Sequence, residues 1–129
     1  MKKITIRNRS IRIDTTDLEI YHLLFGVLDS SDKHKIYLKK LRGVSGYTYT
    51  DLNGERKDTL RRIEIDHRKG DFFGTLVHEL LHAVFPKYSE RIICLLEREY
   101  LLKSSWKQKR TLLIKFLFRR SKGEENGRF

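Results

Sequence analysis

The feature that most constrains this 129-residue chain is the run His78-Glu79-Leu80-Leu81-His82, in which two histidines lie four residues apart. On an α-helix, side chains at positions i and i+4 lie one above the other, so both imidazoles would reach one metal ion from the same side. Glu79 lies about 100° further round such a helix. It is therefore better placed to hold a metal-bound water as a general base than to be a third ligand.

The residues around this run predict a helix with one buried side. Asp71 precedes the helix as a cap, and Pro86 ends it. The apolar residues between them follow the helical period: Phe73, Val77, Leu80, Leu81 and Val84. Because the two histidines fall beside this apolar stripe, we expect them in the half-buried wall of a cleft. The alternative is a pair of unrelated histidines on a helix surface.

A second predicted helix offers the third protein ligand that a catalytic zinc site needs. Ser89 is a suitable N-cap for this helix, and the link to it from the first helix is short. The second helix should therefore fold back on the first and bring Glu90 close to His82. Glu97 lies two turns further along the same face and is the other candidate. Glu90 would also fit an ordinary first-turn acid that the helix dipole favours.

These residues resemble the short HExxH zincins, in particular the gluzincin-like mini-peptidases and the small metallopeptidases of phage genomes. The resemblance covers roughly residues 60–102 and lies in three stretches: Ile63 to Asp66, Thr75 to Ala83, and Ser89-Glu90. It implies a zinc ion held by His78, His82 and Glu90, with Glu79 as general base, in a peptidase that acts on peptides or proteins. No histidine follows His82, so the three-histidine site of the metzincins is excluded.

The length of the chain allows one domain with a single modest core. Apolar alternation predicts short strands near residues 4–6, 11–13, 36–38, 47–50 and 62–66, and helical spacing predicts a helix after the capping cluster at residues 14–16. Asn53-Gly54 is typical of a hairpin turn. We therefore predict an α+β, zincin-like domain over residues 1–102. It would contain an antiparallel β-meander, an N-terminal helix, the motif helix and a following helix that bears the third ligand.

The predicted strand from Ile63 to Asp66 bears on substrate binding. Zincins commonly bind extended peptide along an edge strand beside the metal cleft, and this strand is a candidate for that role. An internal strand, covered on both edges, fits the sequence equally well. Tyr47, Tyr49 and Tyr88 are candidate donors to a developing oxyanion, and each also fits a plain packing residue.

The basic residues are concentrated at the C-terminus. The formal net charge is +11, and residues 103–129 hold nine Lys or Arg against two acids. Residues 103–122 contain no acid and interleave basic with apolar residues, which predicts a basic amphipathic helix or extension followed by a disordered tail at 123–129. The segment could be a helix docked on the core with a solvated basic face. It could instead contact nucleic acid, or an anionic membrane or protein partner.

The single cysteine, Cys94, excludes an intramolecular disulfide and fits a reducing compartment. We expect its side chain on the apolar side of the second helix. Arg7 and Arg9 interrupt any apolar segment that export would need, and no run is long enough to span a bilayer. The sequence therefore predicts a cytoplasmic protein without a transmembrane segment.

Together these features predict a zinc-dependent hydrolase, most simply a small metallopeptidase in which Glu79 activates a zinc-bound water. The competing prediction is a non-catalytic basic module that binds nucleic acid and has a structural or degenerate metal site.

Overall fold

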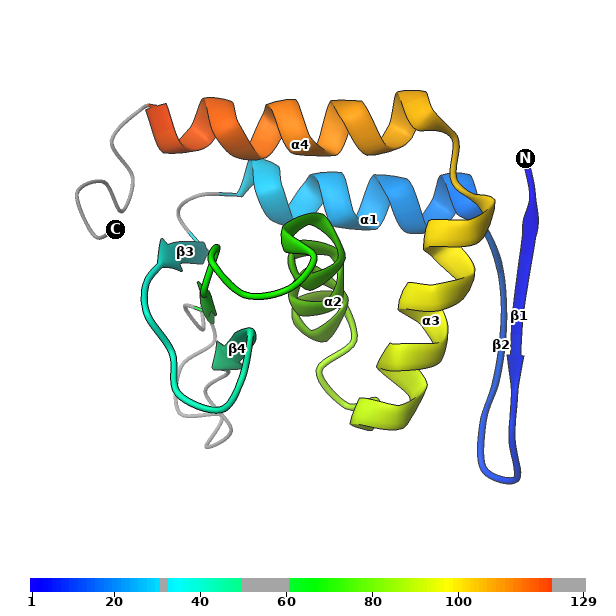
Figure 1. The fold of residues 1–129 in the computed structure, drawn as a ribbon. Coiled ribbons are helices and arrows are strands. Elements are labelled where there is room, and N and C mark those ends of the chain that lie inside the picture. Colours follow the sequence, from blue (N-terminus) through cyan, green and yellow to red (C-terminus); the bar gives the residue numbers. More distant parts are fainter. Residues whose placement is uncertain (31–32, 50–60, 122–129) are drawn as a thin grey trace.

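The computed structural model describes residues 1–30, 33–49 and 61–121, which form two small sheets and four helices (Figure 1). In chain order the elements are β1 (Lys3–Arg7), β2 (Arg12–Thr16), α1 (Asp17–Asp29), β3 (His34–Leu38), β4 (Gly46–Tyr49), β5 (Arg61–Ile65), α2 (Phe72–Val84), α3 (Glu90–Lys103) and α4 (Trp106–Ser121). This combination of helices with small sheets confirms the predicted α+β class.

The first sheet is an N-terminal hairpin of β1 and β2, which contain the strands predicted near residues 4–6 and 11–13. Its turn is held by Asn8, whose side-chain oxygen accepts hydrogen bonds from the backbone N–H groups of Ser10 and Ile11, each at 2.9 Å. The chain then passes directly into α1. Thr16 ends β2 and also caps the helix, because its hydroxyl oxygen accepts a hydrogen bond from the N–H of Glu19 at 3.1 Å.

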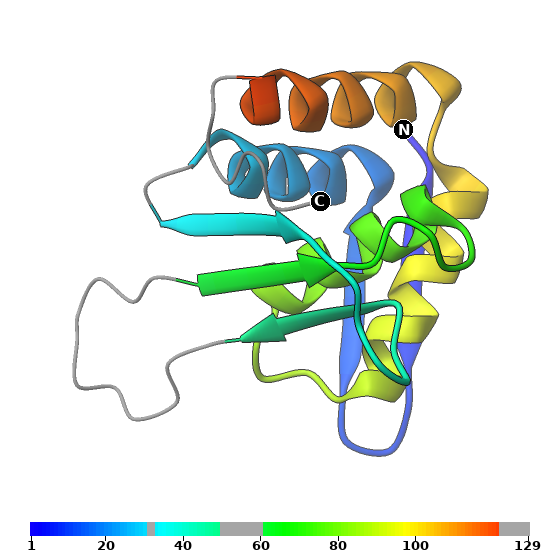
Figure 2. The ribbon, with the colours of Figure 1, turned by 60° about the vertical axis from the view of Figure 1, so that its left-hand side comes forward.

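The second sheet has the strand order β3-β5-β4, with β5 parallel to β3 and antiparallel to β4 (Figure 2). The predicted antiparallel arrangement is confirmed for β4 with β5, and β3 adds a parallel pairing that the sequence did not predict. Residues 39–45 carry the chain from β3 to the far side of the sheet, and β5 fills the position between β3 and β4. The reason is burial: Ile63 and Ile65 are fully buried and Glu64 between them is also buried. A strand covered on both faces takes the centre of a sheet.

The central position of β5 resolves what the sequence left open for residues 63–66. This strand is internal, and β4 forms an edge in the described part of the sheet. The predicted turn at Asn53-Gly54 lies outside the described residues. Directly after β5, the buried carboxylate of Asp66 accepts hydrogen bonds from the side chain of Arg68 at 3.1 Å and from the N–H of Leu41 at 3.0 Å. These bonds hold the pKa of Asp66 well below its ordinary value and tie together the two loops beside the sheet.

The helices complete a layered domain in which α4 lies along α1 as the outermost layer (Figures 1 and 2). Buried apolar side chains from the hairpin, from β3 and β5 and from all four helices form one core. In α4, Leu112 and Phe116 are fully buried, and the Phe116 ring packs against Phe72 at 5.5 Å between centroids. The segment predicted at 103–122 thus includes a helix docked into the core. The predicted tail at 123–129 lies outside the described residues.

Polar contacts fix α4 near both of its ends. Gln108 accepts a hydrogen bond from the hydroxyl of Tyr100 at 3.0 Å and donates one to Asp17 at 3.0 Å. Arg119 is 5% exposed and donates to the carbonyl of Val27 at 3.3 Å. Among the described helices, none combines the length and the apolar character needed to cross a lipid bilayer.

The docking of α4 predicts that alanine substitutions at two nearby positions of this helix will differ clearly in their effect on stability. Leu112→Ala should lower the free energy of unfolding by about 2–5 kcal/mol, because it leaves a cavity in the shared core. Ile114→Ala is the matched control, since Ile114 is 50% exposed, and it should change the free energy of unfolding by less than about 0.5 kcal/mol. Urea denaturation measures both values. Equal, small effects would contradict the packing of α4 described above.

Candidate metal centre

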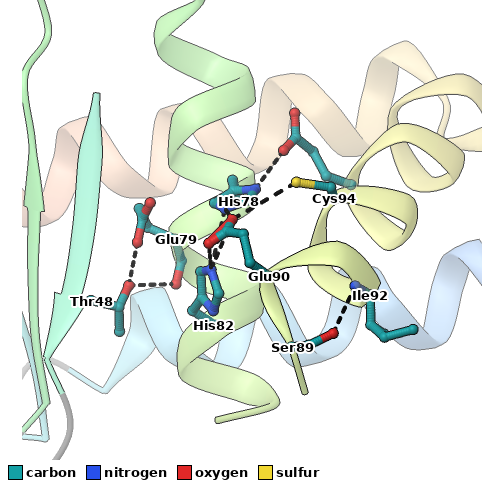
Figure 3. A network of polar contacts seen from close by, with 9 residues as sticks. Thr48, His78, Glu79, His82, Ser89, Glu90, Ile92 and Cys94 are labelled. Carbon is teal, nitrogen blue, oxygen red and sulfur yellow. Dashed lines mark hydrogen bonds and ion pairs between the residues drawn. The ribbon is translucent and has the colours of Figure 1, made fainter. Parts of the chain in front are cut away.

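Helix α2 brings the two motif histidines together on one side (Figure 3). It begins after Asp71 and ends at Val84, as predicted, although the Asp71 side chain makes no capping hydrogen bond. Four side chains on its opposite side are fully buried: Leu76, Val77, Leu80 and Leu81. This burial leaves His78 and His82 half-buried, with their Nε2 atoms 3.2 Å apart. Both ring nitrogens therefore point to the same small region.

The first residue of α3 completes this group. The hydroxyl of Ser89 accepts a hydrogen bond from the N–H of Ile92 at 3.3 Å and so sets the start of the helix at Glu90. The two carboxylate oxygens of Glu90 lie 3.2 and 3.4 Å from Nε2 of His82, and one of them also contacts Nε2 of His78 (Figure 3). Three potential ligand side chains from two helices converge on one point.

Glu97 contacts the same histidine from the other side of its ring. Its Oε1 lies 2.7 Å from Nδ1 of His78, whereas Glu90 contacts Nε2. Burial alone would lower the pKa of His78, but the hydrogen bond to Glu97 and the charge of Glu90 raise it above the ordinary value. The sequence offered Glu90 and Glu97 as candidates for the third ligand, and it is Glu90 that lies beside the Nε2 atoms of both histidines. Glu97 lies where it can orient the imidazole.

The spacing of the three converging groups provides a test of whether they fit a metal ion. In a tetrahedral zinc site with bonds of 2.0–2.1 Å, neighbouring ligand atoms are about 3.3–3.4 Å apart. The two Nε2 atoms are 3.2 Å apart, and Nε2 of His82 is 3.2 and 3.4 Å from the oxygens of Glu90. Burial alone would raise the pKa of Glu90. The nearby His78 and His82 outweigh this effect, so the pKa of Glu90 lies below its ordinary value. These separations match ligands of one small divalent cation, except that Glu90 lies closer to Nε2 of His78 than two such ligands would.

Cys94 also faces this group, which corrects the expectation that it lies on the apolar side of α3. Its side chain is exposed, and its Sγ lies 3.8 Å from Oε1 of Glu90. Ligand atoms of His78, Glu90 and Cys94 all lie within 4.8 Å of one another. The helix buries a different side, which carries Ile92, Ile93, Leu96 and Tyr100. The thiol is therefore a further potential ligand at the edge of the site.

Glu79 lies on the strand side of the site and is only 5% exposed. The hydroxyl of Thr48 in β4 lies 2.6 Å from its Oε1 and donates to it (Figure 3). Gly46 allows this close approach, because a Cβ there would lie 2.8 Å from Cγ of Glu79 and 2.9 Å from its Oε2. Burial raises the pKa of Glu79 above its ordinary value, and the hydrogen bond from Thr48 partly offsets the effect. Such a carboxylate is a stronger base than an exposed one.

Two cavities of about 440 and 280 Å³ lie along β4 and border the group. Both are lined by Gly46, Glu79 and Glu90; the larger also reaches His78 and the smaller reaches His82. We refer to the two together as the β4 cleft. Of the tyrosines considered as oxyanion donors, Tyr47 lines the smaller cavity, whereas Tyr88 stacks on the ring of Phe85.

Sequence reasoning did not place Cys94, Gly46 or Thr48 at the β4 cleft. Cys94 was detectable, because Glu90, Cys94 and Glu97 are spaced i, i+4 and i+7 and so share one face of a helix. Gly46 and Thr48 had no local signal, since they meet Glu79 across 31 residues or more of chain.

Comparison with known proteins does not assign the chain to a family, because no protein-family model, no curated protein and no solved structure matches it.

The contact between β4 and Glu79 predicts that position 46 tolerates only glycine. Gly46→Ala should lower the free energy of unfolding by about 1–3 kcal/mol, because the methyl group meets the buried stem of Glu79 and also the methyl of Thr75 at 2.9 Å. Gly26→Ala is the control: a Cβ there has nothing within 4 Å, and the substitution should stabilise α1 by up to about 1 kcal/mol. Denaturant unfolding distinguishes the two. A neutral Gly46→Ala would mean that β4 and Glu79 are not in close contact.

Proposed function

We propose that the chain is a small zinc-dependent hydrolase of the HExxH zincin type, and that it is a peptidase. The observation that carries the proposal is the pairing of a converging His78, His82 and Glu90 group with a buried carboxylate, Glu79, across one cleft. Three protein ligands beside an open cavity are typical of catalytic zinc sites, whereas structural sites are closed by four.

In this proposal the metal is held by Nε2 of His78, Nε2 of His82 and the carboxylate of Glu90. Glu97 keeps the His78 ring oriented through its hydrogen bond to Nδ1, which is the usual arrangement around metal-bound imidazoles. When bound, zinc supplies a Lewis acid that polarises a carbonyl and lowers the pKa of a bound water. Imidazole and carboxylate ligands also accept other divalent ions.

Glu79 is the proposed general base. Thr48 donates to Oε1, so this hydrogen bond fixes the orientation of the carboxylate in the cleft. The raised pKa of Glu79 suits a group that takes a proton from water and later returns it to a leaving amine. Both events take place on the same carboxylate and require no further acid from the chain.

The shape of the β4 cleft supports a peptide as the substrate. The cavities are lined by the loop before β4, at Val44 and Ser45, and by residues 46–48 of β4, which is an edge strand of the described sheet. An extended peptide fits beside such a strand, because the strand offers main-chain hydrogen bonds at regular intervals. The strand proposed for this role is β4, in place of the stretch at residues 63–66 that the sequence suggested.

Removal of the proposed base should separate metal binding from turnover. Glu79→Gln should retain one zinc per chain and lower peptide hydrolysis by about 10²–10⁴-fold, because the amide cannot accept a proton. Zinc content by mass spectrometry and hydrolysis of a mixed peptide library measure the two properties. Glu99→Gln is the matched control on α3, where Glu99 pairs with Lys103 at 3.1 Å. Full hydrolysis by Glu79→Gln, or none by the zinc-loaded wild-type protein, would contradict the proposal.

Zinc affinity should rank the contributions of Glu90 and Glu97 to the metal site. Glu97→Ala should weaken zinc binding by about 10–100-fold, as expected for a partner that orients a ligand. Glu90→Ala and His82→Ala should each weaken it more than Glu97→Ala does, and Glu99→Ala should leave it unchanged. Competition with a chelating dye measures these affinities. A larger loss in Glu97→Ala than in Glu90→Ala would exchange the proposed roles.

A substitution of Cys94 distinguishes the proposed hydrolase from the competing class, which is a non-catalytic module with a closed structural zinc site. If the thiol were a fourth ligand, Cys94→Ala would release zinc as readily as Glu90→Ala does. In the proposed hydrolase, Cys94→Ala retains both zinc and turnover. The same affinity measurement therefore decides between an open and a closed site.

A further inference from the structure

The outer side of α4 combines large apolar and basic side chains that are exposed to solvent. Trp106 is 76% exposed, and Ile114, Leu117 and Phe118 are each about half exposed. Lys107 and Arg110 are exposed beside them. At about 100° per residue these positions share an arc of about 120°. We call these six residues the α4 outer face.

This face is separate from the side of α4 that packs on the protein. Leu112, Phe116 and Arg119 are buried and lie on the opposite side of the helix. The core therefore already accounts for one apolar side of α4 and leaves the second unexplained. Contiguous exposed apolar side chains on a small domain usually mark an interaction surface.

We propose that the α4 outer face docks on the surface of an anionic lipid bilayer. The face is about 18 Å long at 1.5 Å per residue and runs parallel to the helix axis, so a flat surface can meet all of it at once. Trp, Leu and Phe with Lys and Arg are the residues that interfacial helices use: the apolar groups enter the boundary of the acyl chains and the cations meet the headgroups.

Charge complementarity favours an anionic bilayer over a second copy of the chain and over nucleic acid. Residues 103–122 contain no acid, so a second copy of the chain on this face would offer Lys107 and Arg110 no opposite charge. Nucleic acid would satisfy those two cations but would offer no apolar surface to Ile114 or Leu117. An anionic bilayer satisfies both kinds of side chain.

Docking through α4 leaves the proposed catalytic cleft accessible. In both ribbon views α4 is the outermost layer, α1 lies beneath it, and β4 is the strand of its sheet farthest from α4 (Figures 1 and 2). The inference therefore concerns where the protein is held, and it does not depend on whether the chain is a hydrolase.

The only tryptophan of the chain provides the test, because Trp106 lies on the α4 outer face. The full chain is titrated with vesicles of phosphatidylcholine alone and with equal parts of phosphatidylcholine and phosphatidylglycerol. We expect a blue shift of the emission and flotation of the protein with the anionic vesicles only. An unchanged emission spectrum, or equal binding to both kinds of vesicle, would overturn the proposal.

Two variant pairs separate the apolar and the electrostatic contributions. The double variant Ile114→Gln/Leu117→Gln should weaken partitioning onto the anionic vesicles by at least about tenfold, because two half-exposed apolar side chains are lost from the α4 outer face. Val44→Gln is the control, since Val44 is 42% exposed and lies in the loop before β4, and it should have no effect. Circular dichroism checks that each variant remains folded.

For charge, Lys107→Gln with Arg110→Gln should weaken partitioning by about 25-fold at low salt, at about fivefold for each basic residue near an anionic surface. Arg91→Gln with Arg98→Gln removes the same charge from exposed positions on α3 and should have a much smaller effect. Equal losses in the two double variants would contradict docking through the α4 outer face, because net charge alone would then drive binding. Sedimentation and an oligonucleotide titration complete the test: a dimer or a nucleic-acid complex that the α4 variants disrupt would assign the face to that partner instead.

Discussion

The burial of one side of α2 is the constraint on which the rest of the site depends. Leu76, Val77, Leu80 and Leu81 are fully buried, and α2 packs against α1, α3, β4 and β5. Because the sides of a helix keep a fixed angular relation, this packing alone sets the direction of His78 and His82. It also turns Glu79 toward β4, where Gly46 and Thr48 receive it. Rotation of α2 would bury a histidine or expose a leucine, so the core holds the imidazoles in place.

The cleft places chemically identical carboxylates in different surroundings. Glu79 is buried against a strand and has a raised pKa, whereas Glu90 is largely exposed beside two imidazoles and has a lowered one. Glu97 makes its contact through the opposite nitrogen of His78. Differences in burial and in partner are what separate a base, a ligand and an orienting group in the proposed hydrolase. The acids of the cleft also contrast with a chain whose formal net charge is +11.

Much of the fold could be predicted where the determining contacts are local. Apolar spacing placed the hairpin, α1, α2 and α3 close to their observed bounds, and Thr16 and Ser89 cap helices as their residue types suggest. The pairing of β3 with β5 was not predictable in this way, because it depends on which strand is buried on both faces. Cys94 was misplaced for a related reason. The buried side of α3 is chosen by its neighbours, and an apolar residue near that side can still face the cleft.

The sequence by itself determined that residues 78–82 are helical and that two imidazoles with an adjacent carboxylate share that helix, since helical periodicity follows from spacing alone. Only the tertiary structure decided that Glu90 meets the two Nε2 atoms while Glu97 meets Nδ1, and that β4 rather than β5 borders the cleft. The physical reason is range. Spacing along a helix is a property of neighbouring residues, whereas the crossing of two helices and the order of strands depend on burial shared by segments far apart in the chain.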